Sequence, residues 1–183
     1  MEPEIVFGLG NPGNQYTNTY HNVGLLFLDA VKAYTRNDAR WLSAGKLYDA
    51  TSCGDIKLVR PKTFMNESGK ALQAALSTFD AHPSQVLVVH DDHDLPFGSY
   101  KFAEPGTGTA GHRGVESIIH TIGNTFPRLR IGISKTPAGL PHRKAERLVL
   151  QKMSSEEKRM LESAFKKICA EHFTALGGSE PET

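Results

Sequence analysis

The chain has 183 residues, of which 39% are hydrophobic and 22% charged, and its formal net charge is +1. Such a chain can bury about two thirds of its unfolded surface in one domain, and the composition is that of an ordinary soluble globular protein. No run reaches the ~20 apolar residues that cross a bilayer, and no signal or transit segment is visible. Cys53 and Cys169 form no CxxC pair, so we predict neither a zinc site nor a disulfide framework, and a reducing compartment is favoured.

Strand and helix patterns alternate along the chain. The run Val-Leu-Val-Val at 86–89 is apolar without alternation, which is typical of a central strand covered on both faces. Ser154 and Glu157 form a capping box ahead of the last helix. The alternation predicts a single-domain α/β/α sandwich with a mixed central sheet over residues 1–176, followed by a disordered tail at 177–183. In order, we expect a strand at 5–7, a helix at 23–31, strands at 47–52 and 56–60, a helix at 66–79, strands at 85–90 and 98–102, a helix at 115–122, a strand at 129–133 and a helix from 154.

Four polar residues, Asn11, His21, Asn66 and Asp91, have the chemistry needed to hydrolyse an activated ester. A histidine such as His21 can deprotonate water near neutral pH, and a carboxylate can fix its tautomer. Asp91 follows the predicted central strand, and open α/β sheets bind ligands at that end. The amide of Asn66 can hold both a water and an oxyanion. Their surroundings are the motifs GLGNPG at 8–13, TYHNVG at 19–24, RPKTFMNESG at 60–69 and HDDHDLPFG at 90–98.

Each of these residues also has a plain alternative role. His21 is a single histidine without a spacing pattern, and Asp91 is one of three aspartates before a Leu-Pro pair, as in a turn. Asn66 fits the N-cap of the following helix equally well. The basic stretch 126–152 is either a solvated surface or a phosphate-binding face.

Three other functions fit the motifs less well. Residues 8–13 satisfy G-x-G-x-x-G, but the polar segment 14–21 follows where a nucleotide-binding helix should open, and Asp29 lies in an apolar helix pattern. Residues 90–94 offer five metal ligands in a row, of which at most two or three can converge, and no second cluster completes a shell. No G-x-S-x-G motif supports a serine esterase.

The four motifs resemble, almost letter by letter, those of bacterial-type peptidyl-tRNA hydrolases: GLxNPGxxYxxTxHNxG, PKTFMNxSG and HDxxDLPxG. The resemblance extends from Ile5 to the last helix. It implies a monomer without metal or cofactor that cleaves the ester of peptidyl-tRNA. By the same resemblance His21 is the base, Asp91 orients it, Asn66 steadies water or oxyanion and Asn11 reads the acylated amino group. The aromatic residues expected to line the cleft, or otherwise to belong to the core, are Tyr16 and Phe64.

The chain departs from the family pattern at three positions. Tyr20 stands where the family has Arg, and Arg113 replaces the Asn of GHNG in a loop closer to eukaryotic variants. Arg113 remains a candidate substrate-binding residue, since a guanidinium can clasp phosphate although it cannot copy an amide. Ala103 replaces the second basic residue of KFK. The candidates for the terminal phosphate of the tRNA are then Lys101, Arg128 and Arg130.

The family resemblance also leaves a different class of function open. Some relatives on this fold bind RNA without catalysis, and Arg113 is the one feature that favours that reading. The intact set of four polar residues favours the enzyme. We expect the protein in the cytoplasm, with the mitochondrion as the alternative.

Overall fold

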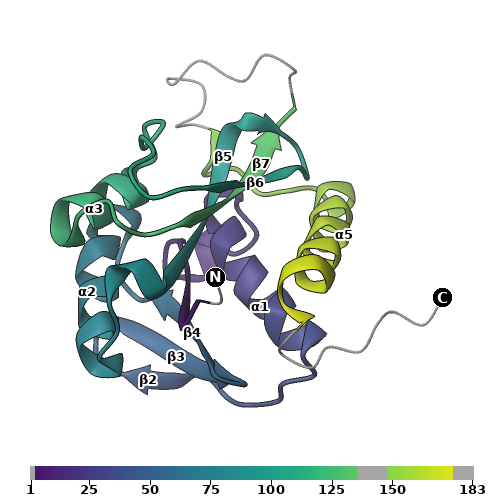
Figure 1. Ribbon diagram of the computed structural model, residues 1–183. Helices are drawn as coiled ribbons and strands as arrows, with labels where there is room; N and C mark the ends of the chain where they lie inside the picture. Colours follow the sequence, from purple (N-terminus) through teal and green to yellow (C-terminus); the bar gives the residue numbers. More distant parts are fainter. Residues whose placement is uncertain (1–2, 136–147, 175–183) are drawn as a thin grey trace.

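A seven-stranded mixed sheet forms the centre of the computed structural model, which describes residues 3–135 and 148–174 (Figure 1). The strand order is β2-β3-β4-β1-β5-β7-β6. The four middle strands β4, β1, β5 and β7 are parallel, whereas β2, β3 and β6 each run antiparallel to a neighbour. The strands are β1 (Ile5–Gly8), β2 (Leu42–Ala44), β3 (Tyr48–Cys53), β4 (Ile56–Pro61), β5 (Val86–Pro96), β6 (Tyr100–Ala103) and β7 (Arg128–Ser134).

Two pairs of helices cover the two faces of the sheet (Figure 1). Helices α1 (Val23–Tyr34) and α5 (Ser155–His172) pack on one face, and α2 (Ser68–Phe79) and α3 (Arg113–Ile122) pack on the other. The predicted α/β/α sandwich with a mixed sheet is therefore confirmed. Within the described residues no helix has the length and apolar character needed to cross a membrane.

The central strands separate two hydrophobic cores. In β5, Val86 and Val88 belong to the core under α2 and α3, whereas Leu87 and Val89 belong to the core under α1 and α5. These four side chains are almost completely buried. Because both faces are covered, every position of the strand is apolar, which explains the run without alternation.

Most predicted elements are present, with differences at their ends. The helix expected from Asn66 begins at Ser68, because Met65–Glu67 form a separate 3-10 turn. Strand β5 continues to Pro96, since it keeps pairing with β7 across an irregularity after Asp92. The capping box of α5 is confirmed, with Ser154 Oγ accepting from the Glu157 amide at 3.2 Å. The expected tail at 177–183 lies outside the described residues.

A close contact between α1 and the sheet sets the position of the turn that carries His21. A Cβ atom on Gly24 would lie 2.5 Å from the Leu9 amide nitrogen and 2.5 Å from the Val89 carbonyl oxygen. Only glycine fits there, so the first turn of α1 lies directly on β1 and β5. His21, three residues earlier in the 3-10 turn Tyr20–Asn22, is held at the carboxyl ends of these two strands.

Candidate active site

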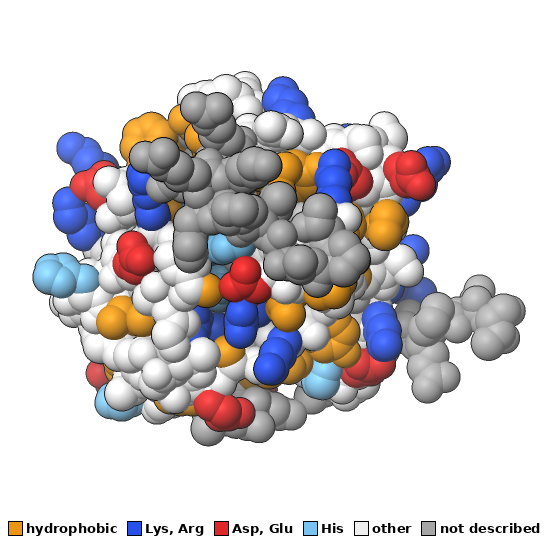
Figure 2. All heavy atoms as spheres, turned by 90° about the horizontal axis from the view of Figure 1, so that it is seen from above, with side chains coloured by type: hydrophobic (Ala, Val, Ile, Leu, Met, Phe, Trp, Pro, Cys, Tyr) orange, Lys and Arg blue, Asp and Glu red, His pale blue; other side chains and the backbone are white. Residues whose placement is uncertain are grey.

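The candidate active site lies where the parallel strands β1 and β5 end. Asn11 follows β1, Asp91 belongs to the later part of β5, and His21 precedes α1. Figure 2 looks onto this end of the sheet and shows a histidine side chain in a hollow near the middle of the face. The structure thus gathers three of the predicted residues at the edge where open α/β sheets bind ligands.

Two histidines share one oxygen of Asp91. His21 Nδ1 lies 2.8 Å from Asp91 Oδ1, and His112 Nε2 lies 3.0 Å from the same atom. Asp91 is 3% exposed and each histidine 9%. An ionised carboxylate only accepts hydrogen bonds, so both nitrogens donate to it. The neutral His21 therefore keeps a lone pair on Nε2, which is the form a general base needs.

The same contacts determine the charge of Asp91. Burial raises the pKa of its carboxyl, but the charges and hydrogen bonds of His21 and His112 outweigh burial and hold the pKa well below its ordinary value. Asp91 is consequently a carboxylate at neutral pH. It can stabilise a positive charge that forms on His21 during proton transfer.

His112 fixes its own tautomer through the helix that follows it. It is the N-cap of α3, and its Nδ1 accepts from the Gly114 amide at 3.1 Å and from the Val115 amide at 3.4 Å. Nε2 must then carry the proton that is donated to Asp91. Sequence reasoning missed this residue, because the helix was expected to begin at Val115, whereas it begins at Arg113 with His112 as its N-cap.

His21, Asp91 and His112 are also a possible metal-binding group, since one ligand atom from each lies within 4.8 Å of the others. A metal would need the lone pair of His112 Nε2. The Nδ1 atom of that ring already accepts two amide protons, so metal binding would leave neither nitrogen protonated. The donor set therefore fits a proton network better than a metal ion.

The run of five possible ligands at 90–94 does not converge. His90 Nδ1 lies 2.7 Å from the Asp91 carbonyl oxygen and donates to it. Asp92 accepts from the Asp94 amide at 2.8 Å and from Arg130. These side chains are thus used in separate local contacts.

Asn11 is held by a reciprocal pair of bonds with Asn22. The Asn11 amide donates to Asn22 Oδ1 at 2.8 Å, and Asn22 Nδ2 donates to the Asn11 carbonyl at 3.0 Å. The Asn11 side-chain oxygen accepts from the Met65 amide at 2.9 Å. Its Nδ2 group is left as the donor that can meet a ligand. Asn22, adjacent to His21 in the motif, was the second residue that sequence reasoning missed.

Asn66, Tyr16 and Phe64 are all less buried than the cluster around Asp91. Asn66 is exposed in the 3-10 turn, and α2 has Glu67 as N-cap without a side-chain cap bond, so the alternative capping role of Asn66 is not seen. Phe64 is 50% exposed and meets Tyr16 edge to face at 6.3 Å between ring centroids. These rings are therefore not core residues. Asn66 and Arg113 both line a cavity of about 440 Å³ between α2 and α3.

The three candidate phosphate ligands have different environments. Arg128 is 1% exposed, and its Nη2 donates to the carbonyls of Thr107 and Gly108 at 2.8 and 2.9 Å. This position argues against the expected phosphate contact, because the guanidinium is already used inside the protein. Arg130 pairs with Asp92 and its side chain is 17% exposed. Lys101 is exposed and lies opposite Arg130 on the neighbouring strand.

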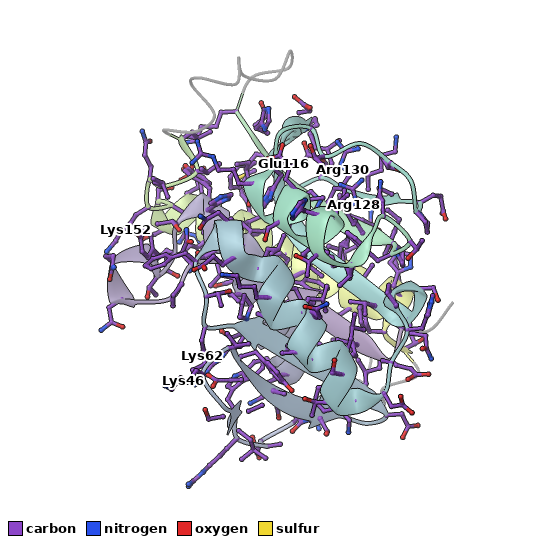
Figure 3. The ribbon with its side chains drawn as sticks, turned by 90° about the vertical axis from the view of Figure 1, so that its left-hand side faces the viewer. Lys46, Lys62, Glu116, Arg128, Arg130 and Lys152 are labelled. Atoms are coloured by element: carbon purple, nitrogen blue, oxygen red, sulfur yellow. The ribbon has the colours of Figure 1, made fainter. Side chains whose placement is uncertain are left out.

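The described part of the basic stretch 126–152 does not form one face. Figure 3 shows Arg128 and Arg130 together beside α3, with Lys152 on the opposite side of that view. Lys135 forms an ion pair with Glu157 at the start of α5. The remaining cations of the stretch lie outside the described residues.

Tyr20, which replaces the family's arginine, fastens the turn of His21 to α5. Its hydroxyl donates to Glu157 Oε1 at 2.8 Å, and the ring is 2% exposed. The backbone adds two bonds, from the Tyr20 amide to Gln151 at 3.2 Å and from the His21 amide to Val149 at 2.8 Å. The turn that carries the histidine is thus fixed on both sides.

Comparison with known proteins points to one family. The family model described as "Peptidyl-tRNA hydrolase" matches residues 5–180. A peptidyl-tRNA hydrolase of Aquifex aeolicus is 41% identical over 172 residues, covering 91% of this chain and 86% of the relative. One of Persephonella marina is 39% identical, covering 87% and 83%.

Solved structures agree with the sequence comparison. The Arg119Gln mutant of peptidyl-tRNA hydrolase from Acinetobacter baumannii superposes with a TM-score of 0.82 at 28% identity, covering 97% of this chain and 90% of that one. Another crystal structure of peptidyl-tRNA hydrolase from Acinetobacter baumannii gives a TM-score of 0.79 at 27% identity, covering 97% of this chain and 94% of that one. This chain belongs to the peptidyl-tRNA hydrolase family.

Proposed function

We propose that this chain hydrolyses the ester between the peptide and the terminal ribose of peptidyl-tRNA, with His21 as general base. The observation that carries the proposal is the hydrogen bond between His21 Nδ1 and Asp91 Oδ1, at 2.8 Å in a nearly buried setting. It leaves Nε2 of His21 free to take a proton from water, without a covalent nucleophile from the protein.

The reaction then has two proton transfers. Water loses a proton to His21 Nε2 as its oxygen attacks the ester carbonyl, which gives a tetrahedral oxyanion. The C–O bond to the ribose breaks, and the imidazolium returns the proton to the leaving hydroxyl. Asp91 stabilises the imidazolium between these steps, and Asn66 steadies the water or the oxyanion through its exposed amide.

Asn11 selects substrates whose amino group is acylated. Its side-chain oxygen accepts from the Met65 amide, which fixes the orientation of the amide and turns Nδ2 toward the ligand as a donor. The acyl carbonyl of a peptide accepts such a bond. The free ammonium of an aminoacyl-tRNA has only donors and cannot pair with Nδ2. The orientation of Asn11 thus supports discrimination against ordinary aminoacyl-tRNA.

The remaining site residues support contacts with the two ends of the substrate. Tyr16 and Phe64 provide an exposed aromatic surface beside the turn of Asn66, suited to the peptide. Lys101 and Arg130 are neighbours on the sheet edge and are suited to the tRNA phosphate. Arg113 begins α3 at the cavity that Asn66 also lines. We propose that the enzyme acts as a monomer in the cytoplasm, where translation supplies its substrate.

The test is release of N-acetyl amino acid from N-acetyl-aminoacyl-tRNA by the purified protein in EDTA, with unacylated aminoacyl-tRNA as control. We expect cleavage of the acylated substrate alone, and no turnover by His21→Ala with tRNA affinity retained. Full activity of His21→Ala would disprove the assignment of the base. Binding without any cleavage by the wild-type protein would favour the non-catalytic RNA-binding function instead.

A further inference from the structure

Arg128 is 1% exposed on β7, and among the described residues it forms no ion pair with an acidic side chain. It lies on β7 and donates twice, to the carbonyls of Thr107 and Gly108. Burial comes first among the effects that lower the pKa of its guanidinium, followed by repulsion from Arg130. A desolvated cation is costly unless its donors are satisfied, and here two loop carbonyls accept from the guanidinium.

The loop that Arg128 holds has little packing of its own. A Cβ atom built at Gly106 or Gly108 would meet nothing within 4 Å. Gly106, Ala110 and Gly111 have positive φ, and for Ala110 that conformation is unfavourable. Polar bonds therefore hold the loop, and Asn124 adds another bond to the Thr107 carbonyl at 3.1 Å.

The loop leads directly to the catalytic cluster. The His112 amide donates to the Thr109 carbonyl at 3.0 Å, and the His112 ring donates to Asp91. A shift at Thr107 and Gly108 is thus carried over five residues to the ring that shares Asp91 with His21. The segment is short, and Thr109 braces it, since its Oγ1 accepts from the Gly111 amide at 3.1 Å.

Arg128 also lies on the same face of the sheet as His90, which contacts His112. Val88 pairs with Arg128 and His90 with Arg130, so His90 and Arg128 point to the same face of adjacent strands. His90 packs against His112 with ring centroids 4.7 Å apart. His90 Nε2, an acceptor, and Arg128 Nε, a donor, are both buried without a hydrogen-bond partner among the described residues. Burial, His112 and Arg128 lower the pKa of His90, which keeps this ring neutral.

We infer that Arg128 is a positioning residue for the hydrolysis: it holds the glycine-rich loop at Thr107 and Gly108 and thereby keeps His112 in place over Asp91. It does so from inside the sheet and without touching the substrate. The effect on catalysis rests on the proposed function, whereas the contacts of Arg128 stand independently of it. It assigns to Arg128 a role different from that of Lys101 on the neighbouring edge strand.

The test compares Arg128→Gln, Arg128→Lys and Lys101→Ala on N-acetyl-aminoacyl-tRNA with and without its 5′-phosphate. For Arg128→Gln we expect kcat to fall about 10- to 100-fold, as for a small misplacement of catalytic groups. KM should stay nearly constant, and the loss should be the same on both substrates. Arg128→Lys should recover part of kcat, because its ammonium can still donate to a loop carbonyl. Lys101→Ala should instead raise KM, and only for the phosphorylated substrate.

Amide hydrogen exchange supplies a second readout that general destabilisation would not reproduce. In Arg128→Gln, exchange should accelerate in residues 107–112 while the turn at residues 20–22 stays as in the wild type. Arg159→Gln, a matched change on the exposed face of α5, should alter neither activity nor exchange. A loss confined to the phosphorylated substrate, or unchanged kcat, would overturn the inference. The wild-type rate, measured alongside, separates failure of the inference from failure of the proposed function.

Discussion

His112 Nε2 and His21 Nδ1 approach the same oxygen of Asp91, at 3.0 and 2.8 Å. The centroids of the two rings are 4.8 Å apart. Two backbone amides at the start of α3 donate to the other ring nitrogen of His112 and fix its orientation. Asp91 therefore cannot rotate toward His21 without breaking a bond to His112. This arrangement fixes the carboxylate before the substrate binds, which is what preorganised catalysis needs.

Asp91→Asn should lower kcat about 10²- to 10⁴-fold with little change in KM. The amide keeps the size of the carboxylate, and its oxygen can still accept N–H bonds, but it carries no negative charge with which to stabilise an imidazolium. The measurement is single-turnover hydrolysis of N-acetyl-aminoacyl-tRNA. The matched control is Asp94→Asn, because Asp94 is exposed three residues later on the same strand. Equal rates for the two variants would disprove the role of Asp91.

Asn22→Asp should weaken the discrimination between acylated and free aminoacyl-tRNA. The new carboxylate can still accept from the Asn11 amide, but it faces the Asn11 carbonyl without a proton to donate. Asn11 should then lose its fixed orientation, and kcat/KM for the acylated substrate should fall about tenfold, as for loss of roughly 1.4 kcal/mol. Asn14→Asp, at an exposed position of the neighbouring turn, is the control. Unchanged selectivity in Asn22→Asp would show that Asn22 does not hold Asn11 during turnover.

The sequence predicts the sandwich and part of the site for one physical reason. Strand ends are visible in a sequence, and open α/β sheets bind ligands at the carboxyl ends of their strands, so Asp91 was expected at the site. The structure also distinguishes Asp91 from the two aspartates that follow it. Asp92 pairs with Arg130, and Asp94 is exposed.

Other features depend on contacts that no local pattern encodes. His112 meets Asp91 only because the chain returns to β5 after β6 and the glycine-rich loop, over 21 residues. Arginines are mostly exposed, so the sequence gives no reason to expect Arg128 inside the protein. It is buried with its guanidinium hydrogen-bonded to two loop carbonyls. The three-residue strand β2 was missed because a strand so short has no measurable alternation.

Glu157→Gln should make stability less dependent on pH in the acid range. Burial raises the pKa of Glu157, but bonds from Lys135, Ser154 and Tyr20 lower it from 4.5 to about 2. A depressed pKa means that this stabilisation is complete above about pH 4.5 and is lost as pH falls toward 2. Urea unfolding of the wild type and Glu157→Gln should therefore differ at pH 7 and converge at low pH.

Glutamine at this position keeps the capping box of α5, so the charge is the main change. Glu156→Gln, in the same first turn, is the control and should follow the wild type across the pH range. A constant difference between wild type and Glu157→Gln from pH 7 to pH 2.5 would contradict the role given to the charge of Glu157.

Lys101→Ala should weaken binding of tRNA without affecting the chemical step. Lys101 is exposed and lies across from Arg130, whose guanidinium is shared with Asp92, so Lys101 is the more accessible of the two cations. Loss of one phosphate contact should reduce the slope of log K against log salt by about one and raise KM at physiological salt. Binding of uncharged tRNA, measured by fluorescence anisotropy from 50 to about 200 mM salt, gives the slope directly. Lys166→Ala on α5 is the control, because that side chain is exposed on the helix layer across the sheet from α2 and α3. If both variants showed the wild-type slope, the phosphate contact would have to be assigned to Arg130 or to Arg113 instead.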